Sequence, residues 1–163
     1  MKLLLCLLLA PFFSLAQQKP SATIKGVVTY FFNTSQGDKP DIGAKVFIVD
    51  TAKCQGYDKA IAFQYDLARI KKLTRTDAGF KTLDDKSHSN FEKIKTAADA
   101  VSCTVDGSGN YSIPVTSGTY YILFQSKGRT SMTMTEIAGN LYLTKVTIKD
   151  GQTMDESHNF PLN

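Results

Sequence analysis

Alternation between apolar and polar positions, the pattern of half-buried β-strands, occupies two blocks of the chain, residues 23–50 and 104–163. The first block opens with a run of β-branched and aromatic residues, which ends at a stretch of turn-forming residues, 33–40. A second strand is predicted at 44–49. The link at 36–43 is predicted to be a loop because it is rich in Gly, Pro and Asp.

Short apolar runs separated by glycine-containing turns make up the second block. The turn Asp-Gly-Ser-Gly-Asn at 106–110 precedes an alternating run at 111–115. Pro114 favours an edge strand or a strand end there, because proline cannot donate to a sheet. Further strands are predicted at 104–105, 119–125, 131–137, 141–149 and 157–162. This spacing indicates a mainly β fold, an antiparallel β-sandwich of about seven strands.

The periodicity changes between the two blocks, at residues 51–103, where apolar residues recur at helical steps of three and four. The first run is Ala60, Phe63, Leu67 and Ile70, and the second is Phe91, Ile94, Ala98 and Val101. A polar loop at 76–90 separates the runs. We therefore expect a two-helix insertion between early strands, which either covers a sheet edge or binds a partner.

The first sixteen residues have the order of a secretory signal peptide. Lys2 is followed by an apolar run, and Ser14 and Ala16 occupy the −3 and −1 positions of a cleavage site between Ala16 and Gln17. The apolar run is shorter than the ~20 residues of a membrane span. The alternatives are an uncleaved anchor and an N-terminal strand. We expect a secreted or periplasmic protein, with a single domain at 17–163 and no transmembrane anchor in the mature chain.

Processing at that site leaves two cysteines, Cys54 and Cys103, which flank the predicted helices. An even pair in an oxidising compartment predicts a disulfide, which would close the base of the insertion and stabilise the fold by roughly 4 kcal/mol. Two free thiols are the alternative. No second Cys or His stands near either cysteine at the spacing of a zinc site, so zinc is not expected.

The charge of the chain is mildly basic, with 19 Lys and Arg against 15 Asp and Glu. The densest basic cluster is Arg69, Lys71, Lys72 and Arg75. A solvated helix face accounts for this cluster, whereas a nucleic-acid site needs a longer basic stripe. No nucleic-acid partner is expected.

Five short segments at 24–28, 39–46, 104–113, 117–122 and 146–151 together resemble the carboxypeptidase regulatory-like family. The resemblance implies a transthyretin-like (prealbumin-like) sandwich, of the kind found in secreted and cell-surface proteins of Bacteroidetes-type bacteria, without catalytic residues. The same fold class includes hydroxyisourate hydrolase. The C-terminal Tyr-Arg-Gly-Ser signature of that enzyme is missing at 159–163, and no enzyme site is carried over.

Catalytic chemistry is poorly represented in the sequence. The two histidines are His88, in the polar loop, and His158, near the last strand. Asp85 and Ser87 stand close to His88, but a catalytic triad is assembled across a fold and not along one loop, so surface histidines are favoured. Asp106, Ser108 and Asn110 alternate like the start of a calcium loop. The twelfth position is Ser117 instead of Glu, so a turn is favoured and a weak cation site stays open. We expect no enzyme, no metal centre and no cofactor.

Two runs of adjacent aromatic residues, at 30–32 and 120–121, supply the remaining candidates for a ligand surface, which are Tyr30, Phe32, Tyr120 and Tyr121. Neighbours in a strand face opposite sides, so one of each adjacent pair is expected in the core. The sequence favours a non-catalytic structural or interaction module of the periplasm or cell surface, with an unidentified protein or glycan partner. A glycan-binding accessory protein is the alternative, followed by a small hydrolase.

Overall fold

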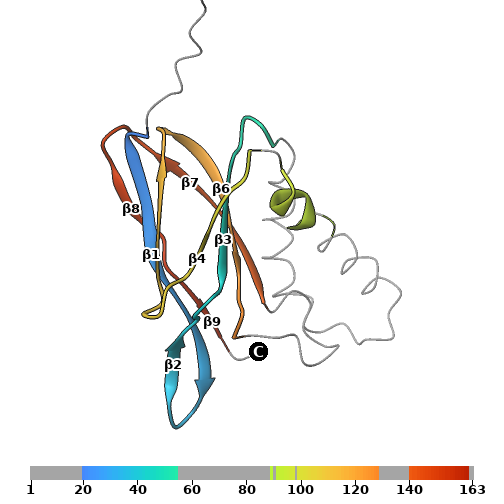
Figure 1. Ribbon diagram of the computed structural model, residues 1–163, viewed down its shortest axis with the longest axis vertical. Coiled ribbons are helices and arrows are strands. Elements are labelled where there is room, and N and C mark those ends of the chain that lie inside the picture. Colours follow the sequence, from blue (N-terminus) through green and yellow to red (C-terminus); the bar gives the residue numbers. More distant parts are fainter. Residues whose placement is uncertain (1–19, 55–88, 90, 98, 129–139, 162–163) are drawn as a thin grey trace, which may run out of the picture.

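The computed structural model describes residues 20–54, 89, 91–97, 99–128 and 140–161. Nine strands in these residues form two sheets that pack face to face as a β-sandwich (Figure 1). The strands are β1 (Ala22–Asn33), β2 (Gly37–Pro40), β3 (Lys45–Asp50), β4 (Val101–Thr104), β5 (Asn110–Val115), β6 (Gly118–Gln125), β7 (Leu141–Ile148), β8 (Thr153–Asp155) and β9 (His158–Phe160). The prediction of a mainly β sandwich is therefore confirmed, whereas the expected antiparallel arrangement of about seven strands is not, because the described residues form nine strands and two of them, β8 and β9, run parallel to β1.

The first sheet is built around the long strand β1. Antiparallel strands β5 and β2 pair in succession with its two halves, and the short strands β8 and β9 pair with it in parallel. The same stretch of β1, Thr23–Lys25, pairs with both β5 and β8, so these two strands lie on opposite edges of β1. Pro114 lies in β5, at the edge of this sheet, where no ladder bond is lost.

The second sheet is antiparallel throughout, in the order β4-β3-β6-β7. Apolar side chains from both sheets fill the space between the layers and form the main core, which includes Ile24, Val46, Ile113, Ile122 and Phe124. The strict alternation of buried and exposed positions along β5 follows from this packing, because only one face of that strand meets the core.

Gly26 in the middle of β1 allows a side chain to cross the strand. Tyr111 stands opposite Gly26 on β5, and its hydroxyl donates a 2.5 Å hydrogen bond to the carbonyl of Glu156, on the far side of β1. A Cβ atom at Gly26 would lie 2.5 Å from that same carbonyl oxygen. Glycine is therefore required here by close packing between strands and not by backbone conformation.

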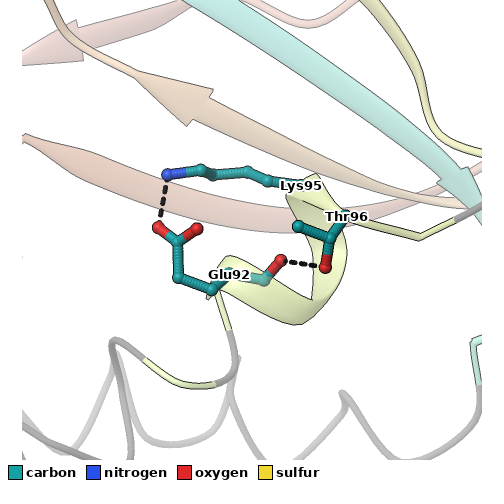
Figure 2. A network of polar contacts seen from close by, with 3 residues as sticks. All are labelled: Glu92, Lys95 and Thr96. Atoms are coloured by element: carbon teal, nitrogen blue, oxygen red, sulfur yellow. Dashed lines mark hydrogen bonds and ion pairs between the residues drawn. The ribbon is translucent and has the colours of Figure 1, made fainter.

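The outer face of the second sheet carries a smaller core. Val49, Tyr121, Leu123 and Leu143 are buried there against Phe91 and Ile94, from the segment between β3 and β4. Residues 91–95 are helical, with the hydroxyl of Thr96 bonded to the carbonyl of Glu92, and Lys95 paired with the Glu92 carboxylate (Figure 2). This helical turn covers a face of the sheet, whereas the sequence suggested that the insertion covers an edge.

The two-helix form of the insertion is not supported. Its second helix is represented by the short turn at 91–95, and β4 begins at Val101, which the periodicity assigned to that helix. The first predicted helix lies outside the described residues, as do the predicted strand at 131–137 and the leader with its cleavage site at Ala16 and Gln17. Within the part of the chain that the structure describes, no helix has the length and apolar character to cross a membrane.

The link at 36–43 was predicted to be a loop, and this prediction is wrong for its first half. Gly37–Pro40 forms β2, whose residues pair with β1 from Thr29 to Asn33. The composition is typical of turns, but β1 is long enough to offer unpaired backbone groups beyond β5. Pairing with those groups draws a short polar segment into the sheet.

The predicted disulfide is absent from the structure, in which Cys54 and Cys103 are both free thiols. Cys103 lies opposite Val46 on β3 and packs against the main core, on the inner face of the second sheet. Cys54 lies beyond the end of β3 and packs against the outer core. The body of the sheet separates the two side chains, so parity of cysteine number was a poor guide to pairing.

We predict that both thiols are free in the native protein. Alkylation in denaturant without reductant should label Cys54 and Cys103 to the same extent as alkylation after reduction, as read by peptide mass mapping. In the native state Cys103 should react slowly, because burial raises the pKa of its thiol and so reduces the thiolate fraction. Labelling that appears only after reduction would contradict this result.

Candidate binding surface

The β1–β2 hairpin projects beyond the other strands at one end of the sandwich (Figure 1). Its turn is held by the side-chain oxygen of Asn33, which accepts hydrogen bonds from the backbone N–H groups of Ser35 and Gln36 at 3.1 and 2.8 Å. Gly37 closes the turn at a φ of 64°, a conformation that favours glycine. These contacts give the hairpin a defined tip without a contribution from the core.

One face of this hairpin presents two aromatic rings and a cation. Tyr30 and Phe32 meet edge to face with ring centroids 6.2 Å apart, and Lys39, which pairs with Tyr30 across the ladder, places its Nζ 4.1 Å from the centroid of Phe32. Tyr30 is half-buried against the main core. Phe32 is 44% exposed. The apolar layer of the core therefore continues along β1 to an exposed ring.

A buried carboxylate anchors this end of the sandwich. Asp41, which follows β2, is 0% exposed and accepts a hydrogen bond from the Ser126 hydroxyl. The other carboxylate oxygen accepts bonds from the backbone N–H groups of Lys127 and Gly128, at 3.1 and 2.7 Å. Three donors from the end of β6 thus converge on one side chain, which ties the β2–β3 turn to the second sheet.

The corner held by Asp41 contacts the aromatic face. A Cβ atom at Gly128 would lie 2.6 Å from the ring of Tyr30, so only glycine allows the ring to pack there. The side chain of Lys127 lies against Gly43, which has a φ of 84° and would place a Cβ atom 2.9 Å from the lysine Cδ. We call Tyr30, Phe32 and Lys39, together with Lys127 at the adjoining corner, the aromatic–lysine surface.

Two of the four aromatic candidates from the sequence do not reach the surface. Tyr120 faces the main core, is 7% exposed, and donates a hydrogen bond to the carbonyl of Thr116. Tyr121 faces the outer core and is 2% exposed. The expectation that one of this pair is exposed is wrong, because apolar side chains cover both faces of the second sheet at this point.

His158 lies in a stack of aromatic rings between the sheets. Its ring is parallel to that of Tyr142 at a centroid distance of 3.8 Å, and it meets Phe160 edge to face at 4.5 Å. Burial lowers the pKa of His158 to about 4, because the charged imidazolium is disfavoured away from water. The histidine is therefore a neutral aromatic element of the core at pH 7. The other histidine, His88, lies outside the described residues.

Asp106 forms hydrogen bonds within its own turn, at 106–110. The carboxylate of Asp106 accepts hydrogen bonds from the backbone N–H groups of Ser108 and Asn110, at 2.8 and 2.9 Å, and Gly109 has a φ of 86°. These backbone bonds hold the pKa of Asp106 below its usual range. The carboxylate thus folds the turn, as the sequence favoured. Within the described ranges, no three His, Cys, Asp or Glu side chains gather closely enough to hold a metal ion.

A hollow of about 510 Å³ lies over β1, β4 and β5 on another part of the molecule. Polar side chains such as Lys25, Ser112 and Asp155 line it, together with the Cys103 thiol. The raised pKa of that thiol keeps it protonated at neutral pH and so a poor nucleophile. The hollow therefore has a polar lining, and its cysteine is not activated as a nucleophile.

Sequence reasoning found Tyr30 and Phe32 but missed the groups that organise the surface around them. Asp41 was assigned to a loop, and Lys39 and Lys127 were ordinary charged residues near turns. A signal was present in the order Pro-Asp-Ile-Gly at 40–43, which is typical of a turn whose aspartate bonds to backbone groups. The partner N–H groups lie more than eighty residues away in sequence, and local pattern cannot reveal them.

Comparison with known proteins finds solved structures that are similar to the chain at low identity. No family model matches, and no curated protein sequence matches. A structure from Pseudomonas aeruginosa, of a protein proposed to bind carbohydrate, is 18% identical with a TM-score of 0.47, covering 88% of this chain and 90% of that one. A minor pilin of Streptococcus agalactiae is 12% identical with a TM-score of 0.41, covering 85% and 43%. The pilus backbone protein of Streptococcus pneumoniae is 12% identical with a TM-score of 0.31, covering 83% and 39%.

Proposed function

We propose that the protein is a secreted, non-catalytic interaction module of the bacterial periplasm or cell surface, which binds its partner through the aromatic–lysine surface. We also assign it to the carboxypeptidase regulatory-like type of sandwich, on the five sequence segments that resemble that family. The observation that carries the proposal is Phe32, an aromatic ring 44% exposed on a projecting hairpin and overlaid by Lys39. Aromatic residues are enriched at binding interfaces, and the hydrogen bonds of Asn33 hold the hairpin that carries this one.

The chemistry of the described residues supports a non-catalytic role. General acid–base catalysis at neutral pH needs a group that titrates near 7 within reach of a substrate. His158 is neutral and packed among aromatic rings, the Asp41 carboxylate is enclosed by three donors, and the Cys103 thiol is protonated. Each of these groups serves the fold, which favours binding over turnover.

The leader at 1–16 supports secretion. Its charged start, apolar run and small residues at Ser14 and Ala16 match the requirements of export and signal cleavage.

A glycan is the second candidate partner, and the geometry of Tyr30 and Phe32 favours it. The apolar C–H face of a sugar ring packs on an aromatic ring, and an edge-to-face pair offers one ring as the platform and the other as a wall. Lys39 at the rim supplies a donor for sugar oxygens.

Phe32→Ala should abolish most of the binding without unfolding the protein. The ring is largely outside the core, so we expect a loss of roughly tenfold or more in affinity with a change in stability below about 1 kcal/mol. Binding is measured on a glycan array and on immobilised cell-envelope fractions, and stability by urea denaturation.

Val101→Ala is the matched control, because Val101 is 51% exposed at the start of β4, away from the hairpin. Its binding should equal that of the wild-type protein. If Phe32→Ala binds every target as well as the wild-type protein does, the aromatic–lysine surface is not the binding surface.

A further inference from the structure

The two lysines of the aromatic–lysine surface are not paired with carboxylates of the described residues. Lys127 is exposed, and neither Lys39 nor Lys127 forms an ion pair within the described residues. Lys39 lies instead over the ring of Phe32. A cation held over an aromatic ring keeps its full charge and stays available to an anion approaching from solvent.

Among the described residues, the acidic groups at the same end are turned away from this surface or occupied within the fold. Asp38 precedes Lys39 on β2, so its side chain points to the opposite face of the hairpin, where Asn159 donates to it at 2.9 Å. Asp41 is buried with three donors, and Asp106 accepts two backbone N–H groups in its own turn. The aromatic–lysine surface therefore presents positive charge together with apolar rings.

We propose that the ligand of the aromatic–lysine surface is an anionic glycan, a polysaccharide that carries carboxylate or sulfate groups at repeated positions. The inference rests on the proposed function and specifies its ligand. Lys39 lies over Phe32, and Lys127 lies at the adjoining corner, where Gly128 packs against the ring of Tyr30 and the Lys127 side chain runs along Gly43. A polymer with a charge on successive sugars can meet both cations while one sugar ring packs on Phe32.

Each group of the surface has a distinct part in this recognition. The ring of Phe32 provides the contact with sugar C–H groups, which does not depend on charge. The lysines form charge-assisted hydrogen bonds to the anionic groups and attract the polymer before contact. Because the surface is open to solvent, salt screens the lysine contribution and leaves the aromatic contribution nearly unchanged.

The test compares charged and neutral forms of the same polymers. Polygalacturonate is paired with its fully methyl-esterified form, and dextran sulfate is paired with dextran, with EDTA present throughout to exclude bridging cations. We expect the purified protein to bind both charged polymers about tenfold or more tightly than their neutral counterparts at low salt, and the difference to shrink near 1 M salt. Affinity is measured by isothermal titration calorimetry and affinity gel electrophoresis.

Substitutions separate the charge from the ring. The double variant Lys39→Met, Lys127→Met should lose about tenfold in affinity for the charged polymers and much less for the neutral ones, to which Lys39 offers only a donor for sugar oxygens. Phe32→Ala should weaken binding to both forms. Lys149→Met is the matched control, because Lys149 belongs to the turn whose Gly151 bonds to Ser21 before β1, at the opposite end of the sandwich from the hairpin. Its affinity for every polymer should equal that of the wild-type protein.

The outcomes distinguish this inference from the proposed function. Equal binding of charged and neutral polymers, lost in Phe32→Ala and kept in the lysine double variant, overturns the anionic ligand and leaves the binding surface in place. Absence of binding to all four polymers, with Phe32-dependent retention on envelope proteins, also overturns the glycan and leaves an interaction module. Binding that survives both sets of substitutions overturns the surface itself.

Discussion

Replacing Asp41 with alanine should lower the free energy of unfolding by about 3–5 kcal/mol, the largest loss we expect from a single side chain outside the apolar core. The substitution removes one acceptor from three donors, and two of them, the N–H groups of Lys127 and Gly128, cannot turn to other partners. Asp41 is fully buried, so water must enter the vacated space to replace the lost bonds. Urea denaturation of the variant and wild-type proteins measures the difference.

Two milder substitutions serve as controls for Asp41→Ala. Asp41→Asn keeps an oxygen for the two backbone donors, and the Ser126 hydroxyl can turn to accept from the new amide, so about 1 kcal/mol should be lost. Ser126→Ala removes a single donor and should cost a similar amount. If Asp41→Ala loses no more than these variants do, the carboxylate does not hold the corner.

Acidification should destabilise the protein through His158. The pKa of this histidine is lowered from 6.5 to about 4 in the folded protein, so between these values the unfolded chain binds a proton that the folded protein does not. The contribution of His158 to the free energy of unfolding is fully present above pH 6.5, and it falls as the pH decreases towards 4. At the shift given, the loss reaches about 3 kcal/mol below pH 4. Urea denaturation measured at intervals between pH 7 and pH 4 follows this loss.

His158→Phe isolates this effect from the carboxylates, which titrate in the same range. Phenylalanine keeps an aromatic ring against Tyr142 and Phe160 and carries no proton. The variant should lose roughly 3 kcal/mol less than the wild-type protein between pH 7 and pH 4. Asp106, whose pKa is lowered, contributes its own acid-sensitive stability to both proteins and cancels in the comparison. Parallel profiles for the two proteins would show that His158 titrates normally in the folded state.

Phe32 and Tyr121 differ in exposure although the sequence treats them alike. Both are aromatic residues in predicted strands, and alternation alone makes one face of each strand a candidate for exposure. On β1, the hairpin carries Phe32 past the end of the second sheet, and the ring is exposed. On β6, the outer face meets Phe91 and Ile94, and Tyr121 is buried. The difference lies in contacts between segments distant in sequence.

The β-sandwich could be predicted from the sequence, because the alternation of strands and the glycine-containing turns are local properties of the chain. Three of the predicted strands correspond closely to β5, β6 and β7, and the turn of Asp106 forms as expected. The short strands β2, β8 and β9 were harder to predict, since each is stabilised by pairing with β1 more than by its own composition. The single strand predicted at 157–162 corresponds to β9 alone.

The sequence by itself determined that this protein is a mainly β sandwich and that its acidic turn folds on Asp106, and it named Tyr30 and Phe32 among four candidates for a ligand surface. Local alternation, turn chemistry and composition carry that information. Only the tertiary structure decided that Cys103 and Cys54 pack against different cores, that Asp41 bonds to residues just after β6, and that Lys39 lies over Phe32. Those outcomes depend on which distant segments the two sheets bring together, and packing of the whole chain sets them.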